Sequence, residues 1–459
     1  MVEQYLEFLN NLAPWLIPGA KAVFSHKITI GVWSFIKSWW WIPLPYFLWK
    51  WFLFFWGWWR TLHIWVPGQK PIVLDIKIPA SGVKPIRAME IVMSELYQAI
   101  YRPPDTWEKW IEGQTQLSYS FEVVSIEGEI HFIIRLRGRQ MRNAIESVIF
   151  SQYPDAEIAE IDDYVKNIPS DIPNNEWDLW GSNYILARPS PYPIRTYDFF
   201  ETEKEPTEEK IIDPMSSLLE AMAKIGKGEQ LWLQIIAKPI SERDFPNMKY
   251  WSEIKEIKEE LSRRKKITPP SRPIILEVID FLLTGKMPGV KKEEEKEIVP
   301  PEMKLTPGER DSLAAVEKKE SKLSFKTVIR FIYLGKKDFF FKPHGRIIFS
   351  YFASFSSPTG NSLIPKGQPI MTKIKKSWFL PINLFAKRRL YLRKRKLFRF
   401  YKWREDPFYP RATEEGTFVL STEELATIFH FPAKGTTLAP LVPKTDMKKG
   451  EAPSSLPWE

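Results

Sequence analysis

The sequence contains no cysteine. This absence excludes disulfide bonds, thiolate nucleophiles, zinc ribbons and iron–sulfur clusters, because each of them depends on cysteine sulfur. Histidine is scarce as well, with five residues in the chain, and no two of them stand at the spacing of a metal site. For His131, which falls in an expected strand, packing is favoured over catalysis. We therefore expect neither a bound metal nor a cofactor.

Motifs for phosphate chemistry are missing too. No Gly-x4-Gly-Lys-Ser/Thr loop occurs, and Gly226–Gly228 closes an expected helix, whereas the glycines of a dinucleotide site open one. Asp162 and Asp163 are adjacent carboxylates, as are Glu423 and Glu424. Adjacent residues diverge in a strand or a helix, so neither pair forms an acid–base dyad by itself. We expect no enzymatic activity from this chain; the alternative is an enzyme whose site is assembled from residues distant in the sequence.

A cleaved secretory signal is not expected either. The first residues include Glu3 and Glu7 where such a signal carries basic residues, and no small-residue cleavage site follows an early apolar run. Apolar residues recur instead at helical spacing over residues 2–16. This amphipathic helix either lies in a membrane interface or packs on another part of the protein.

The stretch that dominates the chain is residues 38–59, SWWWIPLPYFLWKWFLFFWGWW. So much apolar surface must be buried in protein or in lipid. Tryptophan, present 20 times in 459 residues, is enriched at membrane interfaces. Helices are expected over residues 21–41 and 45–65. Residues 1–67 as a whole are expected to anchor the protein to a membrane. The expected anchoring side chains are Trp39, Trp40, Trp41, Phe47, Trp49, Trp51, Phe54, Phe55, Trp56, Trp58 and Trp59.

How this anchor meets the bilayer stays open. Residues 39–59 have the length of a membrane span, about 20 residues, but Lys50 lies near the middle and costs roughly 3 kcal/mol there. The alternatives are a span, an interfacial or re-entrant arrangement in which the cations reach water, and a helix packed inside an oligomer. The cations Arg60 and Lys70 favour a cytoplasmic body at the inner membrane.

Residues 68–170 contain six segments with alternating or helical hydrophobic periodicity. The expected elements are a strand at 71–79, a helix at 86–101, strands at 117–126 and 129–136 joined by a turn at Glu127-Gly128, a helix at 140–153 and a strand at 156–161. The order strand, helix, strand, strand, helix, strand is that of a ferredoxin-like unit.

The same order recurs in residues 190–376. The expected elements are a strand at 194–202, a helix from Asp213 to Ile225 with Asp213 as N-cap, strands at 230–237 and 324–334, a helix at 345–355 and a strand at 369–375. A charged insertion, residues 240–322, stands where the first unit has its hairpin turn. We expect a helix at 250–266 in this insertion and a mobile linker at 291–322.

The expected fold is therefore α+β: tandem ferredoxin-like units behind an aromatic, membrane-associated helical segment. The repeat is inferred from element order, because the residues themselves do not visibly recur. A basic-aromatic segment follows at 377–410. Residues 411–459 are expected to form a short helix, capped by Ser421 or Thr422, and a proline-rich tail.

The net charge of +10 suits an anionic partner, and its densest part is residues 387–404. As a helix, this segment can gather Leu390, Leu397, Phe400 and Tyr401 on one side. Three interpretations remain open: binding of acidic lipid or another partner, binding of DNA, and a solvated helix packed on the body. The expected contacts of an anionic partner are Lys387, Arg388, Arg389, Arg393, Lys394, Arg395, Lys396 and Arg399.

Several runs resemble the non-ATPase region that precedes the motor domain in conjugation-type P-loop ATPases of bacteria (type IV secretion, HerA/FtsK-like). The runs are VLDIKIP at 73–79, RAME at 87–90, FEVVSIEGEIHF at 121–132, SQYPDAEIAE at 151–160, YPIRTY at 192–197, GEQLWLQIIAK at 228–238, RLYLRKRKL at 389–397 and LSTEELATIFHFP at 420–432. Each run alone is weakly specific, and the resemblance depends on their order.

In the fused relatives a motor domain with a phosphate loop would follow the last run. The resemblance therefore implies a membrane-anchored platform for a separate P-loop ATPase, in a machine that translocates DNA or protein. A homo-oligomer is compatible with this role. The alternative is a DNA-binding adaptor that uses residues 387–404.

Overall fold

The computed structural model describes residues 37, 41, 44–79, 84–200, 213–246, 248–261, 305–366, 372–374, 385–404 and 416–432. They belong to two compact units, the smaller made of residues up to Pro67 together with residues 105–114. It contains α4 (Leu44–Arg60), η1 (Thr61–Trp65), the first two residues of α5 (Val66–Gly68) and η2 (Glu108–Glu112). The helix predicted at 45–65 is confirmed. The helix predicted at 2–16, and all but two residues of that at 21–41, lie outside the described residues.

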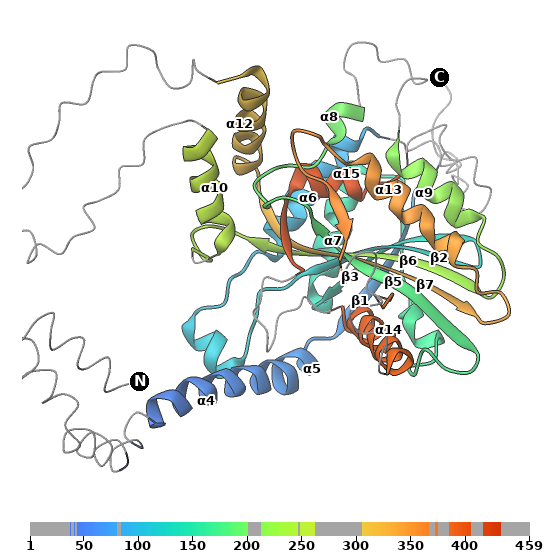
Figure 1. The fold of residues 1–459 in the computed structure, drawn as a ribbon, viewed down its shortest axis with the longest axis horizontal. Coiled ribbons are helices and arrows are strands. Elements are labelled where there is room, and N and C mark those ends of the chain that lie inside the picture. The colour runs from blue at the N-terminus through green and yellow to red at the C-terminus, as the bar shows by residue number, and fades with distance from the viewer. Residues whose placement is uncertain are drawn as a thin grey trace, which may run out of the picture. The chain divides into compact units, whose positions relative to one another are not determined.

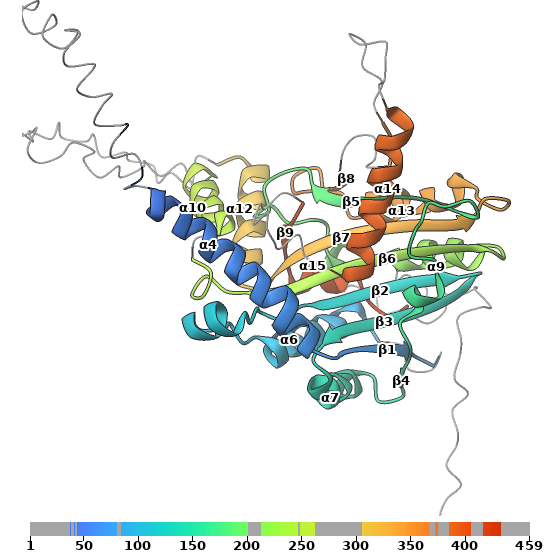
Figure 2. The same ribbon diagram turned by 90° about the horizontal axis from the view of Figure 1, so that it is seen from below.

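The larger unit is built on one antiparallel sheet, with strand order β4-β1-β3-β2-β6-β7-β5-β8 and β9 paired to β7 (Figure 2). The strands are β1 (Pro71–Lys77), β2 (Tyr119–Ile126), β3 (Glu129–Arg137), β4 (Glu157–Glu160), β5 (Trp177–Leu186), β6 (Glu229–Ile240), β7 (Ser324–Lys336), β8 (Leu363–Pro365) and β9 (Phe418–Ser421).

Within the described residues, the helices of the larger unit range in length from single turns to 18 residues. In chain order they are α6 (Ile86–Ile100), η3 (Arg139–Met141), α7 (Arg142–Gln152), η4 (Tyr164–Asn167), α8 (Tyr197–Phe200), α9 (Pro214–Ala223), α10 (Lys249–Leu261), α12 (Pro307–Glu320), η7 (Lys342–Arg346), α13 (Ile347–Ser354), α14 (Ala386–Trp403) and α15 (Thr422–Ile428).

The six elements predicted in residues 68–170 are confirmed as β1, α6, β2, β3, α7 and β4. Strands β2 and β3 form the expected hairpin, in which Ile126 pairs with Glu129. The two turn residues, Glu127 and Gly128, have φ of 52° and 95°. Positive φ at both positions is the requirement of a type I′ turn, whose twist matches that of the strands it joins.

The second half of the sheet differs from the prediction at its two outer strands. Its first strand is β5, whereas the strand predicted at 194–202 is wrong: residues 194–196 are irregular and α8 follows. The tertiary partners explain this, because Glu424 and Thr427 accept hydrogen bonds from the amides of Ile194 and Tyr197, which a ladder would otherwise use. The last strand is β8, and residues 372–374 of the strand predicted at 369–375 are not extended in a sheet.

The inner elements of this half are confirmed, as α9, β6, β7 and α13. Asp213 caps α9 by accepting a hydrogen bond from the Met215 amide. Strands β6 and β7 pair directly along their length although the insertion separates them. Within the insertion, α10 confirms the first part of the predicted charged helix.

The predicted linker at 291–322 is wrong for its second half, which forms α12. Thr306 and Glu309 form a capping box, with each side chain bonded to the other's backbone amide. Together with Pro307 at the first helical position, this box starts the helix despite the Lys/Glu-rich composition. Residues 291–304 lie outside the described residues.

The two faces of the sheet carry different cores. On one face, strand residues such as Phe121, Ile235 and Phe331 pack with α6, α7, α9, α13 and α15. On the other, Val124, Trp232 and Ile332 pack with η4 and α14. In Figure 1, α13 and α14 accordingly lie on opposite sides of the strands. The molecule is thus an α+β protein with a large antiparallel sheet and an N-terminal aromatic-rich helix.

Candidate functional site

Helix α4 presents a line of exposed apolar side chains. Leu44, Leu48, Phe52, Phe55 and Trp59 recur three or four residues apart, which places them on one side of a helix, and all five are exposed. We call these five residues the aromatic stripe. Trp49 and Trp51, which flank it, are also exposed. An exposed apolar patch of this kind marks a surface that another molecule or a membrane covers.

The opposite side of α4 is held by residues 105–114 of the same unit. Trp56 Nε1 donates to the carbonyl of Trp110 at 3.0 Å, and Thr61 Oγ1 donates to that of Gly113 at 2.9 Å. Gly113 has φ of 73°, and a Cβ there would lie 2.7 Å from the Arg60 carbonyl carbon. Glycine is therefore required at this contact, which fixes which side of the helix stays open.

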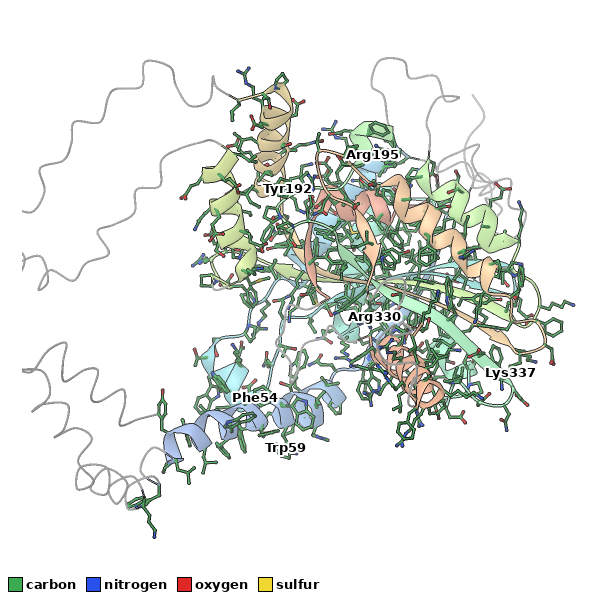
Figure 3. The ribbon with its side chains drawn as sticks, in the orientation of Figure 1. Phe54, Trp59, Tyr192, Arg195, Arg330 and Lys337 are labelled. Atoms are coloured by element: carbon green, nitrogen blue, oxygen red, sulfur yellow. The ribbon has the colours of Figure 1, made fainter. Side chains whose placement is uncertain are left out.

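The structure divides the predicted anchoring residues between these two sides. Trp41, Trp49, Trp51, Phe55 and Trp59 are exposed, whereas Phe54, Trp56 and Trp58 are partly buried; Figure 3 shows Phe54 and Trp59 on different sides of α4. Trp39, Trp40 and the side chain of Phe47 lie outside the described part. Among the helices that the structure describes, none is both long and apolar enough to cross a membrane.

Helix α14 is the second candidate surface. It carries nine lysine and arginine residues and no acidic residue. Its buried side chains are Leu397, Phe398 and Tyr401, which belong to the core on that face of the sheet, and Lys394. The segment thus packs on the body of the protein by an apolar side, as the third interpretation of the sequence states. The buried phenylalanine on that side is Phe398, whereas the sequence analysis expected Phe400. Apart from Arg393, which is half-buried, the remaining cations are exposed.

Seven of the eight cations predicted to bind an anionic partner keep some exposure. Lys387, Arg388, Arg389, Arg395, Lys396 and Arg399 are exposed, and Arg393 is half-buried with its Nη1 2.9 Å from the Lys373 carbonyl oxygen. None of the seven forms an ion pair with a carboxylate of the described residues.

Lys394 is the exception. It is buried, and its Nζ lies 2.5 Å from Asp178 Oδ1 on β5. The charge of Lys394 is balanced by Asp178 inside the protein, so Lys394 is not part of the exposed cationic surface that the other seven residues form. The sequence contains the signal for this: Lys394 precedes Leu397 by three residues and Tyr401 by seven, a spacing that puts all three on one side of a helix.

A row of polar side chains lies beneath α14 and was not anticipated from the sequence. Glu122, Gln234 and Arg330 are register partners on β2, β6 and β7, so their side chains emerge on the same face. Gln234 Nε2 donates to Glu122 Oε1 at 2.9 Å, and Arg330 Nη1 donates to Gln234 Oε1 at 3.2 Å. All three are buried. In Figure 3, Arg330 lies in the sheet close to α14.

Glu122 is the centre of this network. Burial raises its pKa, but the charge of Arg404 and hydrogen bonds from Arg404, Ser120 and Tyr164 outweigh burial and lower the pKa from 4.5 to about 2. Tyr164 Oη donates to Glu122 Oε2 at 2.7 Å and also lies 2.8 Å from Tyr401 Oη. Glu122 is therefore a structural carboxylate that stays ionised, and it is fully enclosed.

The same network caps the C-terminus of α14. Arg330 Nη1 donates to the Phe400 carbonyl at 2.6 Å, and Arg137 Nη2 donates to that of Trp403 at 3.1 Å. Cationic donors at this end of a helix satisfy its last carbonyl groups and interact favourably with the negative end of its dipole. The sheet thus fixes the last turn of α14.

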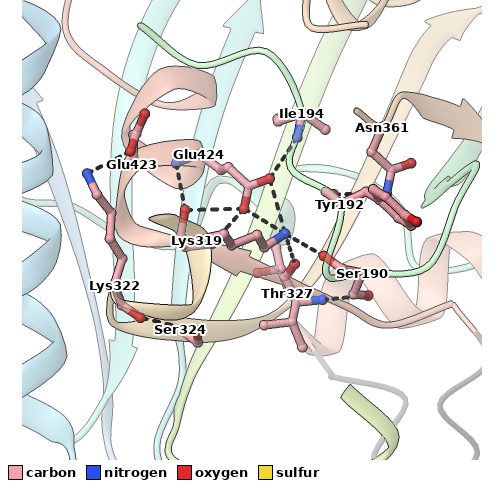
Figure 4. Close-up of polar contacts among 12 residues, drawn as sticks. Ser190, Tyr192, Ile194, Lys319, Lys322, Ser324, Thr327, Asn361, Glu423 and Glu424 are labelled. Carbon is pink, nitrogen blue, oxygen red and sulfur yellow. Dashed lines mark hydrogen bonds and ion pairs between the residues drawn. The ribbon is translucent and has the colours of Figure 1, made fainter. Parts of the chain in front are cut away.

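A second buried ion pair joins α12 to α15 (Figure 4). Lys319 Nζ lies 2.9 Å from Glu424 Oε2 and donates to the carbonyl groups of Ser190 and Val419 at 2.6 and 3.0 Å. Burial lowers the pKa of Lys319, and Glu424 opposes that effect. Glu424 also closes a capping box with Ser421, which settles the expected cap in favour of Ser421. These contacts tie α12, α15 and the carbonyl groups of Ser190 and Val419 together.

A cavity of about 970 Å³ lies between α6, α8 and α12. Four of its charged side chains are in ion pairs: Lys322 Nζ lies 2.7 Å from Glu90 Oε1, and Lys318 is bonded to Asp198 and to Glu423. Within the described ranges, no three histidine or acidic side chains are grouped as metal ligands.

Three of the histidines pack against carboxylates in the described residues. His131, His344 and His430 lie 3.0, 3.0 and 2.9 Å from Asp75, Glu229 and Asp213. His63 is exposed on η1, and His26 lies outside the described part.

Comparison with known families gives one match. A family model described as "Domain of unknown function (DUF8128)" matches residues 80–340, which include most of the sheet. No curated protein matches the chain.

Proposed function

This chain belongs to the DUF8128 family, and we propose that it is a non-catalytic, membrane-tethered platform on which a separate motor protein docks. The proposed machine is a translocation system of the conjugation or type IV secretion kind, at the inner membrane with the body in the cytoplasm. The motor is proposed from the sequence resemblance alone. The tether rests on an observation of the structure.

That observation is the aromatic stripe of α4. Five exposed apolar side chains, together with exposed tryptophans beside them, cover one side of the helix, while the other side is bonded to residues 105–114. Each aromatic ring carries about 150–250 Å² of surface. At about 25 cal/mol per Å², even partial transfer of several rings into a membrane interface is worth several kcal/mol. The arrangement supports attachment along the length of the helix.

The body fits a platform made of two similar halves. We propose that each half is a ferredoxin-like unit. The supporting observation is the strand order: β4-β1-β3-β2 in the first half and β8-β5-β7-β6 in the second, which is the same order by chain position. The two halves meet where β2 pairs with β6. Such a body offers broad surfaces for protein partners without a catalytic centre of its own.

A second candidate function is a DNA-binding adaptor. It is supported by the exposed cations of α14, which lack acidic partners in the described part of the chain. Phosphate contacts of this kind give binding that weakens steeply with salt.

The tether is tested by flotation of the full-length protein with vesicles of zwitterionic lipid. Replacing Phe52, Phe55 and Trp59 by serine should strongly reduce flotation, because the variant loses the three aromatic rings of the stripe. A matched control replaces by serine Phe199, Phe339 and Phe341, which are also exposed aromatic residues and belong to the larger unit. If the two triple variants float equally well, the stripe is not the tether.

The docking role is tested by purifying the full-length chain from its native membranes in mild detergent. A P-loop ATPase should co-purify with the wild-type chain. Its absence, under conditions in which other complexes of the same membranes stay intact, counts against the platform.

A further inference from the structure

The solvent side of α14 combines cations with apolar side chains. Arg388, Arg395 and Arg399 follow one another at intervals of seven and four residues, so they share the side opposite the buried Leu397. Leu392 and Trp403, eleven residues apart and therefore almost exactly three turns, lie on the same side and are 52% and 46% exposed. Phe385, just before the helix, is 71% exposed.

Several of the cations lie beside exposed rings. The Arg399 guanidinium lies 5.3 Å from the centre of the Trp403 ring, and that of Arg395 lies 6.0 Å from the centre of the Tyr391 ring. A cation next to an aromatic ring is an arrangement that keeps both at the boundary between water and an apolar phase. The outer side of α14 thus carries cations on either side of Leu392 and Trp403. We call these two exposed residues the apolar line.

We propose that this face of α14 docks on a bilayer that contains acidic phospholipid. The cations would contact the headgroup phosphates, while Leu392 and Trp403 enter the interface between headgroups and acyl chains. The apolar line favours lipid over nucleic acid as the partner. Phosphate contacts of a nucleic acid use the cations, but they leave an exposed leucine at the centre of the contact without a role.

The mounting of α14 is suited to this contact. Its inner side is fixed by Leu397, Phe398 and Tyr401, and its last turn is capped by Arg330 and Arg137. The helix is therefore already formed before it meets the bilayer, so binding does not lose free energy to ordering it. This distinguishes it from basic segments that fold only on a membrane.

Docking of α14 can be tested separately from the tether on α4, because only docking of α14 depends on the charge of the lipid headgroups. Flotation of the full-length protein on zwitterionic vesicles reports the tether, and the gain in affinity on vesicles with acidic phospholipid reports α14. Each cation near such a surface is worth about fivefold in affinity. Replacing Arg388, Arg395 and Arg399 by glutamine should therefore weaken binding to acidic vesicles roughly a hundredfold and leave binding to zwitterionic vesicles unchanged.

A matched control removes the same charge elsewhere. Lys166, Lys224 and Lys249 are also strongly exposed and lie outside α14, and their replacement by glutamine should have little effect on vesicle binding. If the two triple variants behave alike, net charge alone matters and the docking face is wrong. Unchanged denaturant unfolding of both variants shows that the fold is kept.

Two further results decide the partner. The double variant Leu392→Ser and Trp403→Ser should also weaken binding to acidic vesicles, because it removes the apolar line. The second result comes from fluorescence anisotropy with duplex DNA at the same salt concentration. If the arginine variant loses DNA binding but keeps its affinity for acidic vesicles, the face binds nucleic acid and the lipid proposal is overturned.

Discussion

Arg404, directly after α14, forms a two-pronged ion pair with Glu122 in the middle of β2: Nε lies 2.9 Å from Oε1, and Nη2 lies 3.1 Å from Oε2. Both side chains are buried. Arg404 also bonds the Asp163 carboxylate, at 2.7 Å from Nη1 to Oδ2. The end of the basic helix is thereby tied to the centre of the sheet, so the position of α14 depends on a charge 282 residues away along the chain.

We expect Arg404→Met to destabilise the fold by about 3–5 kcal/mol, because it leaves the Glu122 carboxylate buried without its counter-charge. Adding Glu122→Gln to this variant should recover part of the loss. The measurement is a double-mutant cycle of the free energies of unfolding in urea. Arg399→Met, an exposed residue of the same helix, serves as control and should change stability by less than about 0.5 kcal/mol. Strictly additive effects of Arg404 and Glu122 would contradict the pairing.

The lowered pKa of Glu122 predicts a specific loss of stability in acid. A carboxyl whose pKa is lower in the folded state stabilises the fold fully above its unfolded value of 4.5, and this contribution is lost as the pH falls through that value toward about 2. The contribution is on the order of 3 kcal/mol. Glu122→Gln should flatten this part of the curve of unfolding free energy against pH. A curve as steep as that of the wild type would assign the acid sensitivity to other groups.

His131 should give a dependence of the opposite sign. Burial lowers its pKa, but the hydrogen bond and charge of Asp75 outweigh burial, so the pKa is raised above 6.5. A base with a raised folded-state pKa contributes stability that is fully present below pH 6.5 and is lost as the pH rises through the folded value. The unfolding free energy of His131→Asn, measured from about pH 5 to about pH 9, should lack this decline. If the unfolding free energies of wild type and variant change with pH in parallel, the ion pair between His131 and Asp75 does not contribute to stability.

Gly181 on β5 allows the backbone of β7 and the side chain of Leu397 to approach closely, and an added methyl group should disrupt this contact. A Cβ there would lie 2.3 Å from the Phe331 carbonyl oxygen and 3.1 Å from Leu397 Cδ2 of α14. Gly181→Ala should destabilise the fold by about 1–3 kcal/mol, as overpacking does. Gly308→Ala is the control, because nothing lies within 4 Å of its Cβ position and alanine favours a helix by up to about 1 kcal/mol. Equal stability of the two variants in urea would contradict the predicted clash.

The aromatic character of α4 and the six elements of residues 68–170 follow from the sequence, because local periodicity and turn chemistry decide them. Phe121, Val123 and their neighbours alternate as a strand must, and Glu127-Gly128 supplies the turn. Ser421, Asp213 and Thr306 likewise start their helices through neighbours in sequence. The capping box at Thr306 was available to sequence analysis and was obscured by the charged composition around it.

The rest depended on contacts between distant segments. Residues 177–186 contain Gly181-Ser182-Asn183, which resembles a turn, yet they form β5 because β7 accepts their backbone and only glycine fits against Phe331. Residues 194–196 look extended but are bonded to α15. The same holds for charge: the sequence determined that α14 would be a basic helix, but only the tertiary structure decided which cations are free. Lys394 meets Asp178 and Arg404 meets Glu122, since a sheet brings carboxylates from remote strands beneath one side of the helix and leaves the other side to solvent.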